Sequence, residues 1–316
     1  MSVHHAAKKG SNCFIRLTAV LLSLVICTAA LSADSRLRVQ PKYHYTVRKD
    51  LSIYFLNADE VIEHIRKTFK RHDWKIDIRY RSKTNNMNDI DVMVKELMDY
   101  ALSETDDPTE GDYLYHQYGG YEITYSYQMD KSTYVYDLSI VPNYYTTPEQ
   151  EEKVTKKVQD LIRYFRFDQN TSDYEKFRKI YDYVYSKVDY DFIHEKNGNY
   201  HLKTTAYAAL INKQAVCQGY SVLMYRLLRE AGLNARVITG MAQNDMGSEY
   251  HAWNIVEIDG AFYNIDITWD KQAESSEYYL KCSRNFKNHI RDEKYDTDEF
   301  NALYPMAQSD YVIVND

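Results

Sequence analysis

The apolar positions in the first half of the chain follow two different periods. Apolar residues recur every three to four positions over 58–71 and about 89–103, which predicts two amphipathic helices. Other segments alternate apolar and polar residues, as half-buried strands do: "WKIDIRY" (74–80), "YEITYSY" (121–127) and "YVYDLSI" (134–140), with the short run "LSIYFL" (51–56) ahead of them. The polar turn "QMDKST" joins the last two strands into an antiparallel hairpin, so this half predicts a small α+β unit.

The pattern becomes helical after the polar, proline-containing stretch 142–150. One helix is predicted from Pro148 to about Arg166, and a second begins at Ser172, where the Ser-x-x-Glu spacing predicts a capping box. A third amphipathic segment, "QAVCQGYSVLMYRLLREAG" (214–232), ends at a glycine suited to the left-handed conformation. Cys217 therefore lies at the first turn of a helix that is expected to be buried.

Three strand-like segments follow this helix, at 235–241, 251–258 and 261–269. The Asp-Gly pair at 259–260 predicts a two-residue hairpin turn between the last two segments. The antiparallel register that such a turn imposes places His251 and Asp266 on the same face as diagonal neighbours. Diagonal neighbours lie about 7–8 Å apart at Cα, so the two side chains are expected to form a hydrogen bond.

The N-terminal segment has the features of a targeting sequence. The basic residues Lys8, Lys9 and Arg16 precede the short apolar run "LTAVLLSLVICTAALS", and small residues near Ser32 permit cleavage. Together these features predict a secretory signal peptide at 1–33. An uncleaved membrane anchor is the alternative, although the run is shorter than the roughly 18–20 apolar residues that a span needs. We expect the mature protein to be secreted or extracytoplasmic.

Removing this segment alters the charge and the cysteine inventory. The 316-residue chain has 39 basic and 46 acidic residues, and loss of the segment's three basic residues leaves 36 basic residues and a net charge of −10. Such a balance makes nucleic acid an unsuitable partner. Only Cys217 and Cys282 remain, and they could form one disulfide in an oxidising compartment. A chain of this length does not need such a crosslink, and we expect Cys217 to be a reactive thiol that does not pair with Cys282. The absence of CxxC or clustered His/Cys spacing argues against a zinc site, so no metal and no cofactor are expected.

Cys217, His251 and Asp266 together offer the chemistry of a thiol enzyme. The start of a helix favours a thiolate, an imidazole can move the proton, and a carboxylate can orient the imidazole. Each residue alone has an ordinary structural interpretation, as a packed thiol, a satisfied histidine or a local hydrogen-bonding aspartate. Their combination is what favours catalysis over packing.

At these residues the sequence resembles the transglutaminase-like superfamily, whose members have a papain-like thiol enzyme core. The resemblance rests on "AVCQGYSVLMYRLLREAGLNARVITG" and "HAWNIVEIDGAFYNIDITWD", preceded by the helix "SDYEKFRKIYDYVYSKVDYD", and it covers about residues 170–285. It implies an α+β fold in which a helix bearing the cysteine packs on an antiparallel sheet bearing the histidine and aspartate. It also implies Cys217 as nucleophile, His251 as general base and acid, and Asp266 as the orienting group, since only Asp266 fits the pattern "DITW".

Several features remain open at the level of sequence. The Cys217 N–H is one natural oxyanion donor, and the second could be Gln214, Gln218 or a group from 241–250. Trp253 could line the cleft or belong to the core. The resemblance permits hydrolysis of peptide or amide bonds, which we favour, or protein crosslinking by transfer to an amine. A non-catalytic binding or cell-wall interaction module, using the tyrosine-rich hairpin, is the third possibility.

The predicted organisation is therefore a signal peptide (1–33), a smaller N-terminal α+β domain (34–145) and a transglutaminase-like catalytic domain (146–316). The expected partner is a protein or peptide substrate, with cell-wall peptides as one option. The N-terminal domain is expected to govern substrate choice.

Overall fold

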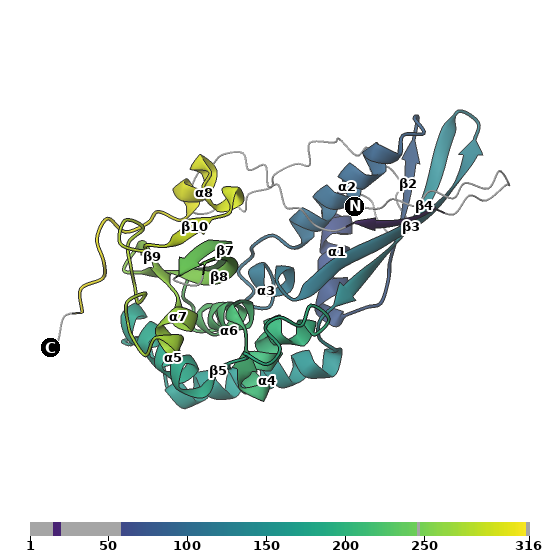
Figure 1. Ribbon diagram of the computed structural model, residues 1–316. Helices are drawn as coiled ribbons and strands as arrows, with labels where there is room; N and C mark the ends of the chain where they lie inside the picture. Colours follow the sequence, from purple (N-terminus) through teal and green to yellow (C-terminus); the bar gives the residue numbers. More distant parts are fainter. Residues whose placement is uncertain (1–14, 20–57, 245–246, 314–316) are drawn as a thin grey trace. The chain divides into compact units, whose positions relative to one another are not determined.

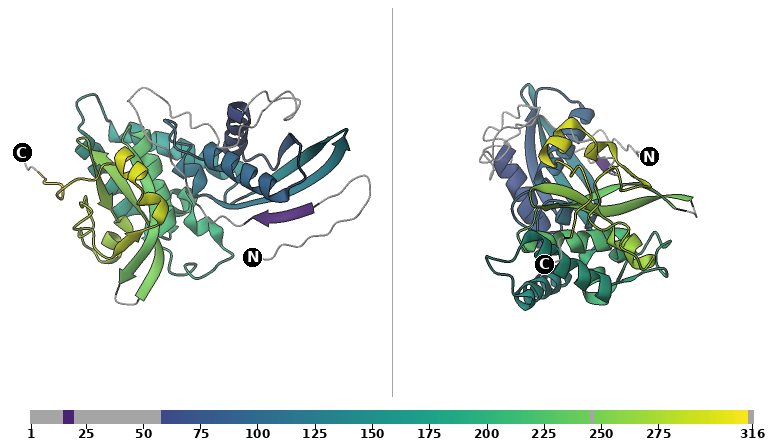
Figure 2. Two further views of the ribbon diagram at one scale, coloured as in Figure 1. Left: turned by 90° about the horizontal axis from the view of Figure 1, so that it is seen from above. Right: turned by 90° about the vertical axis from the view of Figure 1, so that its left-hand side faces the viewer.

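The computed structural model describes residues 15–19, 58–244 and 247–313, and its internal contacts divide them into two units. The described parts of the first unit are residues 15–19, 58–104 and 118–144. The described parts of the second unit are residues 105–117, 145–244 and 247–313. Figures 1 and 2 show the helices and strands of each. The chain has a mixed α+β fold, as the sequence predicted.

The first unit is a four-stranded antiparallel sheet with two helices. The strands, in the order β1-β3-β4-β2, are β1 (Ile15–Ala19), β2 (Ile76–Ser82), β3 (Tyr118–Asp130) and β4 (Thr133–Tyr144). Helices α1 (Ala58–Arg71) and α2 (Met87–Ala101) contact each other and bury their apolar faces. The predicted helices and the predicted hairpin are confirmed, and Asn86 caps α2 by accepting a hydrogen bond from the Asn88 N–H.

Strand β1 falls within the segment predicted to be a signal peptide. The other residues of that segment, and the predicted strand at 51–56, lie outside the described residues. Among the described residues, none of the helices combines the length and the apolarity needed to cross a membrane.

The second unit surrounds one buried helix, α6 (Cys217–Glu230), in which every residue from Gly219 to Leu228 is buried. Its other helices are α3 (Asp112–Tyr115), α4 (Pro148–Phe165), α5 (Asp173–Lys187), α7 (Ile267–Gln272) and α8 (Asp298–Leu303). Short helical turns are η1 (His201–Thr204), η2 (Ala208–Asn212) and η3 (Glu293–Tyr295). Thr147 and Ser172 form the capping boxes of α4 and α5, the second of which the sequence predicted.

An antiparallel sheet in the order β10-β7-β8-β9 packs against α6. Its strands are β7 (Ala235–Asn244), β8 (Gly247–Ile258), β9 (Ala261–Ile265) and β10 (His289–Arg291), and a separate parallel pair joins β5 (Asp189–Tyr190) to β6 (Gln214–Ala215). Asp259 and Gly260 both have positive φ, as the predicted hairpin turn requires, and Ile258 pairs with Ala261 in the predicted register.

The structure differs from the sequence-based expectation for the strand predicted at 261–269. Strand β9 ends at Ile265, because the Asp266 side chain accepts hydrogen bonds from the Thr268 and Trp269 N–H groups and thereby caps α7. Asp266 therefore lies at a strand-to-helix junction and not inside a strand.

Residues 105–117 were assigned by sequence to the N-terminal domain, but they group with the second unit. Asp112 carries much of this association, since its carboxylate accepts hydrogen bonds from the Arg236 side chain at 2.8 and 3.1 Å and from the Val237 N–H at 2.7 Å. Strand alternation around 118–127 gave no sign of these contacts, which join segments far apart in the sequence.

Candidate functional site

Cys217 is the first residue of α6, directly after the extended residue Val216. The side chain is partly exposed and forms no disulfide, and neither does Cys282, which is buried. The backbone N–H of Cys217 has no acceptor within its own helix because it belongs to the first turn. The thiol and this N–H group thus lie together at the positive end of the helix dipole.

Gly219 allows the start of α6 to be approached closely by its neighbours. A Cβ atom at this position would lie 2.8 Å from the Lys203 carbonyl oxygen and 2.7 Å from the Ala215 Cβ. The Val216 N–H also donates to the Lys203 carbonyl at 3.1 Å. Close contacts with Lys203 of η1 and Ala215 of β6 therefore fix the position of the cysteine.

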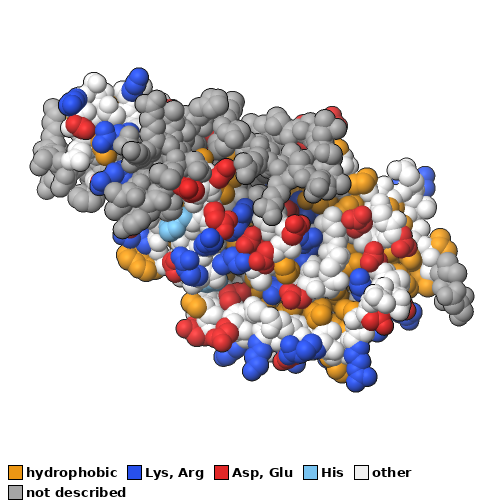
Figure 3. Space-filling view, turned by 180° about the vertical axis from the view of Figure 1, so that it is seen from behind, with side chains coloured by type: hydrophobic (Ala, Val, Ile, Leu, Met, Phe, Trp, Pro, Cys, Tyr) orange, Lys and Arg blue, Asp and Glu red, His pale blue; other side chains and the backbone are white. Residues whose placement is uncertain are grey.

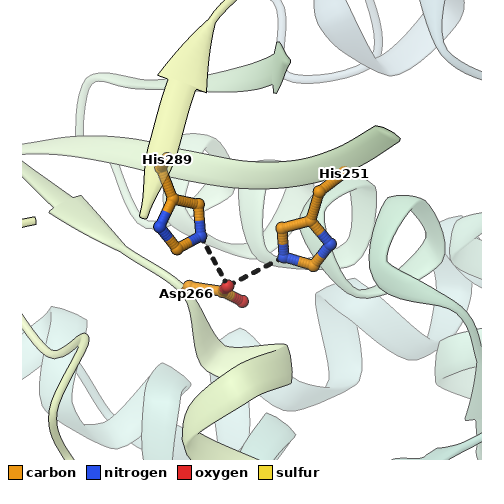
Figure 4. A group of neighbouring side chains, drawn as sticks. All are labelled: His251, Asp266 and His289. Atoms are coloured by element: carbon orange, nitrogen blue, oxygen red, sulfur yellow. Dashed lines mark hydrogen bonds and ion pairs between the residues drawn. The ribbon is translucent and has the colours of Figure 1, made fainter. Parts of the chain in front are cut away.

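His251 and Asp266 form a buried hydrogen bond beside this helix. The Nε2 atom of His251 in β8 lies 2.8 Å from Oδ2 of Asp266, and both side chains are almost completely inaccessible to solvent. Because Asp266 engages Nε2, the Nδ1 atom of His251 is the ring nitrogen left for proton exchange with another group. Figure 4 shows the two side chains pointing toward each other across the strand-to-helix junction.

Asp266 accepts four hydrogen bonds. Oδ1 receives the N–H groups of Thr268 at 3.0 Å and Trp269 at 3.1 Å, and Oδ2 receives His251 and, at 3.1 Å, Nε2 of His289. Burial alone would raise the pKa of this carboxyl, but the two histidines lower it well below its usual range. Asp266 is therefore ionised.

The electrostatic environment favours a protonated His251. Burial works against the charged ring, but Asp266 and the Cys217 side chain, through charge and hydrogen bonding, raise the pKa of His251 well above its usual value. Burial also raises the pKa of Tyr190, and the Cys217 side chain adds to this rise through its charge. The three sequence-predicted residues thus come together in one place.

Comparison with known proteins bears on this geometry. Residues 152–267 match the family model of the transglutaminase-like superfamily, and this range includes Cys217, His251 and Asp266. Residues 152–267 form a transglutaminase-like domain. The match begins within α4 and ends at the first residue of α7, so it includes α6 and the β7–β9 part of the sheet.

Two curated relatives match this chain in alignments that are 108 residues long. They are the kyphoscoliosis peptidases of Mus musculus, at 29% identity, and of Homo sapiens, at 28%. Each match covers 31% of this chain and only 16% of the relative's length. Among solved structures, the crystal structure of a TGase has 21% sequence identity and a TM-score of 0.33, over 46% of this chain and 43% of that one.

The cleft candidates of the transglutaminase-like domain have different environments. The Gln218 side-chain amide donates from Nε2 to the His116 carbonyl oxygen at 2.5 Å, which ties the residue after the cysteine to the segment 105–117. Gln214 lies exposed in β6. Trp253 is buried among apolar residues of the sheet and the C-terminal segment, with Ile238, Ile255, Phe262 and Phe286 in the same cluster.

Sequence reasoning did not find His289, the second histidine of the domain's buried cluster. It lies in β10, 23 residues after Asp266 along the chain, and no periodicity or turn signal connects the two. Nitrogen and oxygen atoms of His251, Asp266 and His289 lie within 4.8 Å of one another, which is also close enough for a metal ion. Nε2 of each histidine lies at hydrogen-bonding distance from Oδ2 of Asp266, at 2.8 and 3.1 Å, so the three side chains form a hydrogen-bonded cluster.

Two further buried groups support the transglutaminase-like domain at this point. Asn254 donates to the carbonyl oxygens of Ser221 in α6 and Arg236 in β7, at 2.9 and 3.1 Å, and so joins the cysteine-bearing helix to the sheet. Asp270 accepts a hydrogen bond from the Tyr181 hydroxyl at 2.7 Å, and burial raises its pKa to about 6. Asp259, the other nearby acid, lies in the β8–β9 turn.

Proposed function

We propose that this protein is a thiol-dependent acyl-transfer enzyme that hydrolyses peptide or amide bonds. Cys217 is the nucleophile, His251 the general acid and base, and Asp266 the orienting group. The observation that carries the proposal is the buried His251–Asp266 hydrogen bond, combined with the influence of the Cys217 thiol on the pKa of the same imidazole. The names of the mammalian relatives, which are peptidases, favour hydrolysis.

The reaction uses the two ring nitrogens of His251 for different tasks. The Cys217 thiolate attacks the substrate carbonyl carbon, and the imidazolium gives its proton to the leaving amine as the C–N bond breaks. The resulting thioester is attacked by water, whose proton passes to His251, and the acid is released as the thiolate forms again. Asp266 remains ionised throughout and holds Nε2, so that Nδ1 faces the reacting atoms.

The second possibility is that an amine replaces water in the last step, which would give crosslinking. The side chains that form the thioester are the same in both reactions, so the acceptor has to be determined by experiment. A third possibility is a binding module that never forms the thioester. For each of these functions we propose a protein or peptide as the molecule that is bound.

The experiment compares the mature protein with a Cys217→Ala variant on three substrates. These are an unfolded protein, peptidoglycan stem peptides, and a glutamine peptide mixed with a fluorescent primary amine. Cleavage that is lost in Cys217→Ala supports hydrolysis, and Cys282→Ala is the matched control, since that buried thiol should be dispensable for turnover. Amine incorporation without cleavage would establish crosslinking, and binding with no Cys217-dependent product would establish the module.

We also propose that the chain is exported and that residues 1–33 are removed. The basic residues followed by the short apolar run support this, as does the cleavage-compatible segment near Ser32. N-terminal sequencing of the protein recovered outside the cytoplasm should begin at or close to Asp34. Recovery of the full-length chain from the cytoplasm alone would contradict export.

A further inference from the structure

His289 contacts a hydrogen-bond acceptor with each of its ring nitrogens. Its Nε2 lies 3.1 Å from Oδ2 of Asp266, and its Nδ1 lies 2.9 Å from the backbone carbonyl oxygen of Lys287. A carbonyl oxygen can only accept a hydrogen bond, and so can an ionised carboxylate. Both ring nitrogens of His289 therefore lie where a hydrogen-bond donor is needed, and only a ring with two N–H groups supplies both donors at once.

The surroundings of His289 are those of a buried cation. Its side chain is completely inaccessible to solvent, and a buried charge of this kind requires a paired opposite charge. Four aromatic rings surround it, with centroid distances between 4.2 and 5.4 Å: Trp253, Trp269, Tyr278 and Phe286. Aromatic rings near a cation stabilise it through their electron-rich faces. The titratable groups that face the ring are Asp266, His251 and Tyr278.

Both histidines converge on one oxygen of Asp266. Figure 4 shows the two imidazole rings on either side of the carboxylate, each joined to the same oxygen atom. The ring centroids of His251 and His289 are 5.7 Å apart. A positive charge at this distance disfavours a second positive charge on His251.

We propose that His289 is a positioning residue whose positive charge divides the charge of Asp266 between two imidazoles, so that His251 releases its proton more readily than it would beside Asp266 alone. This role rests on the function proposed above. An ion pair with Asp266 alone would hold the proton on His251, whereas general acid catalysis requires it to be given to the leaving amine. The His289 hydrogen bond also fixes the orientation of Oδ2, and thereby that of the His251 ring.

The charge of His289 is tested first, without any substrate. Nuclear magnetic resonance of protein labelled with ¹⁵N-histidine should show both ring nitrogens of His289 protonated at neutral pH, with the signal assigned by its loss in His289→Gln. A spectrum of a neutral ring, with one protonated and one bare nitrogen, would overturn the proposal. This measurement is independent of turnover, so it separates a failure of this inference from a failure of the proposed enzymatic activity.

Kinetics then tests the effect on His251. In His289→Gln, the alkaline limb of the kcat/KM profile should move to higher pH by about one unit, because the nearby positive charge is gone. Turnover should fall on the order of tenfold, as a catalytic group is held less firmly. The matched control is His201→Gln, which removes an exposed histidine that stacks on Tyr145 and should leave the profile unchanged.

Two results would contradict a positioning role. One is a His289→Gln variant that melts at a lower temperature but keeps the wild-type position of the alkaline limb, which would mean that His289 serves stability alone. The other is a stoichiometric metal ion in the purified protein that is lost on substitution of His289, which would mean that the cluster binds a metal.

His289→Phe, which keeps an aromatic ring in the aromatic surroundings, should shift the alkaline limb in the same direction as His289→Gln.

Discussion

Asp266 has two structural tasks that its two carboxylate oxygens divide between them. Oδ1 caps α7 by accepting hydrogen bonds from the Thr268 and Trp269 N–H groups. Oδ2 forms hydrogen bonds with the side chains of both buried histidines. An asparagine can keep the acceptor that caps the helix, but it is neutral and presents an amide where the second oxygen was. Substitution by asparagine therefore separates the electrostatic task from the capping task.

We predict that Asp266→Asn lowers kcat/KM by about 10²- to 10⁴-fold, because the His251 ring loses its orienting charge. The remaining activity should lose its alkaline limb at lower pH than the wild type. The sign follows from the pKa of His251, which Asp266 raises: without that charge, the imidazolium gives up its proton at lower pH. A pH series of initial rates measures this, with thermal melting as a check on folding. An alkaline limb at the wild-type pH would show that Asp266 does not set the charge of His251.

At the scale of elements, the start of α6 depends on the absence of a side chain at Gly219. The neighbouring Lys203 carbonyl oxygen and Ala215 Cβ occupy the space that a methyl group would need. The position of Cys217 relative to the sheet therefore follows from how closely these backbones approach the first helical turn.

We predict that Gly219→Ala destabilises the protein by about 1–3 kcal/mol, since the overlap involves backbone that cannot simply rotate away. Turnover should also fall, even under conditions where the variant stays folded, because the start of α6 carries Cys217, the proposed nucleophile. Gly198→Ala is the control, because a Cβ at Gly198 meets no atom within 4 Å. Chemical denaturation and initial rates measure both effects. Equal stability of the two variants would contradict the close approach.

Sequence patterns predicted an element best where the same local backbone preference produces both the pattern and the structure. The Asp259–Gly260 turn fixed the β8–β9 register because two residues with positive φ admit few hairpin geometries. The strand was predicted too long because alternation continues through Asp266, while the capping hydrogen bonds of its side chain begin a helix there. His289 was missed because its contact with Asp266 arises from tertiary packing, which leaves no local pattern.

At the scale of the molecule, a buried charge pair joins segment 105–117 to strand β7 of the second unit. Burial would raise the pKa of Asp112, but Arg236, through charge and hydrogen bonding, lowers it. The carboxylate is nearly inaccessible to solvent, and it also receives the Val237 N–H. This contact and the Gln218–His116 hydrogen bond join the segment to β7 and α6, two elements of the site.

We predict that Asp112→Asn lowers the free energy of unfolding by about 3 kcal/mol at neutral pH, because it leaves Arg236 without its buried partner. The pKa of Asp112 is lowered in the folded state, so its contribution is present above the ordinary carboxyl range and is lost as the pH falls below it. The difference between wild type and variant should therefore shrink in acid. Urea denaturation at neutral and acidic pH measures it. Asp160→Asn removes an exposed ion pair with Arg163 and should change stability by less than about 1 kcal/mol. An equal effect of both substitutions would contradict the importance of the buried pair.

The charges of the surface are mixed on the face seen in Figure 3, where acidic and basic side chains are interspersed over the described residues.

The tyrosines of the β3–β4 hairpin mostly pack on one another, with the rings of Tyr127, Tyr134 and Tyr136 in mutual contact. The expectation that the N-terminal domain, to which this hairpin belongs, governs substrate choice remains a prediction.

The rate at which Cys217 is alkylated tests the central proposal most directly, because it needs no knowledge of the substrate. Iodoacetamide is added at neutral pH to wild type and to His251→Ala, and peptide mass spectrometry follows Cys217 and the buried Cys282 separately. If His251 and Asp266 activate the thiol, Cys217 should react at least on the order of tenfold faster in the wild type than in His251→Ala. Cys282 should remain slow in both. Equal alkylation rates of Cys217 in the two proteins would contradict an activated cysteine and, with it, the proposed enzyme.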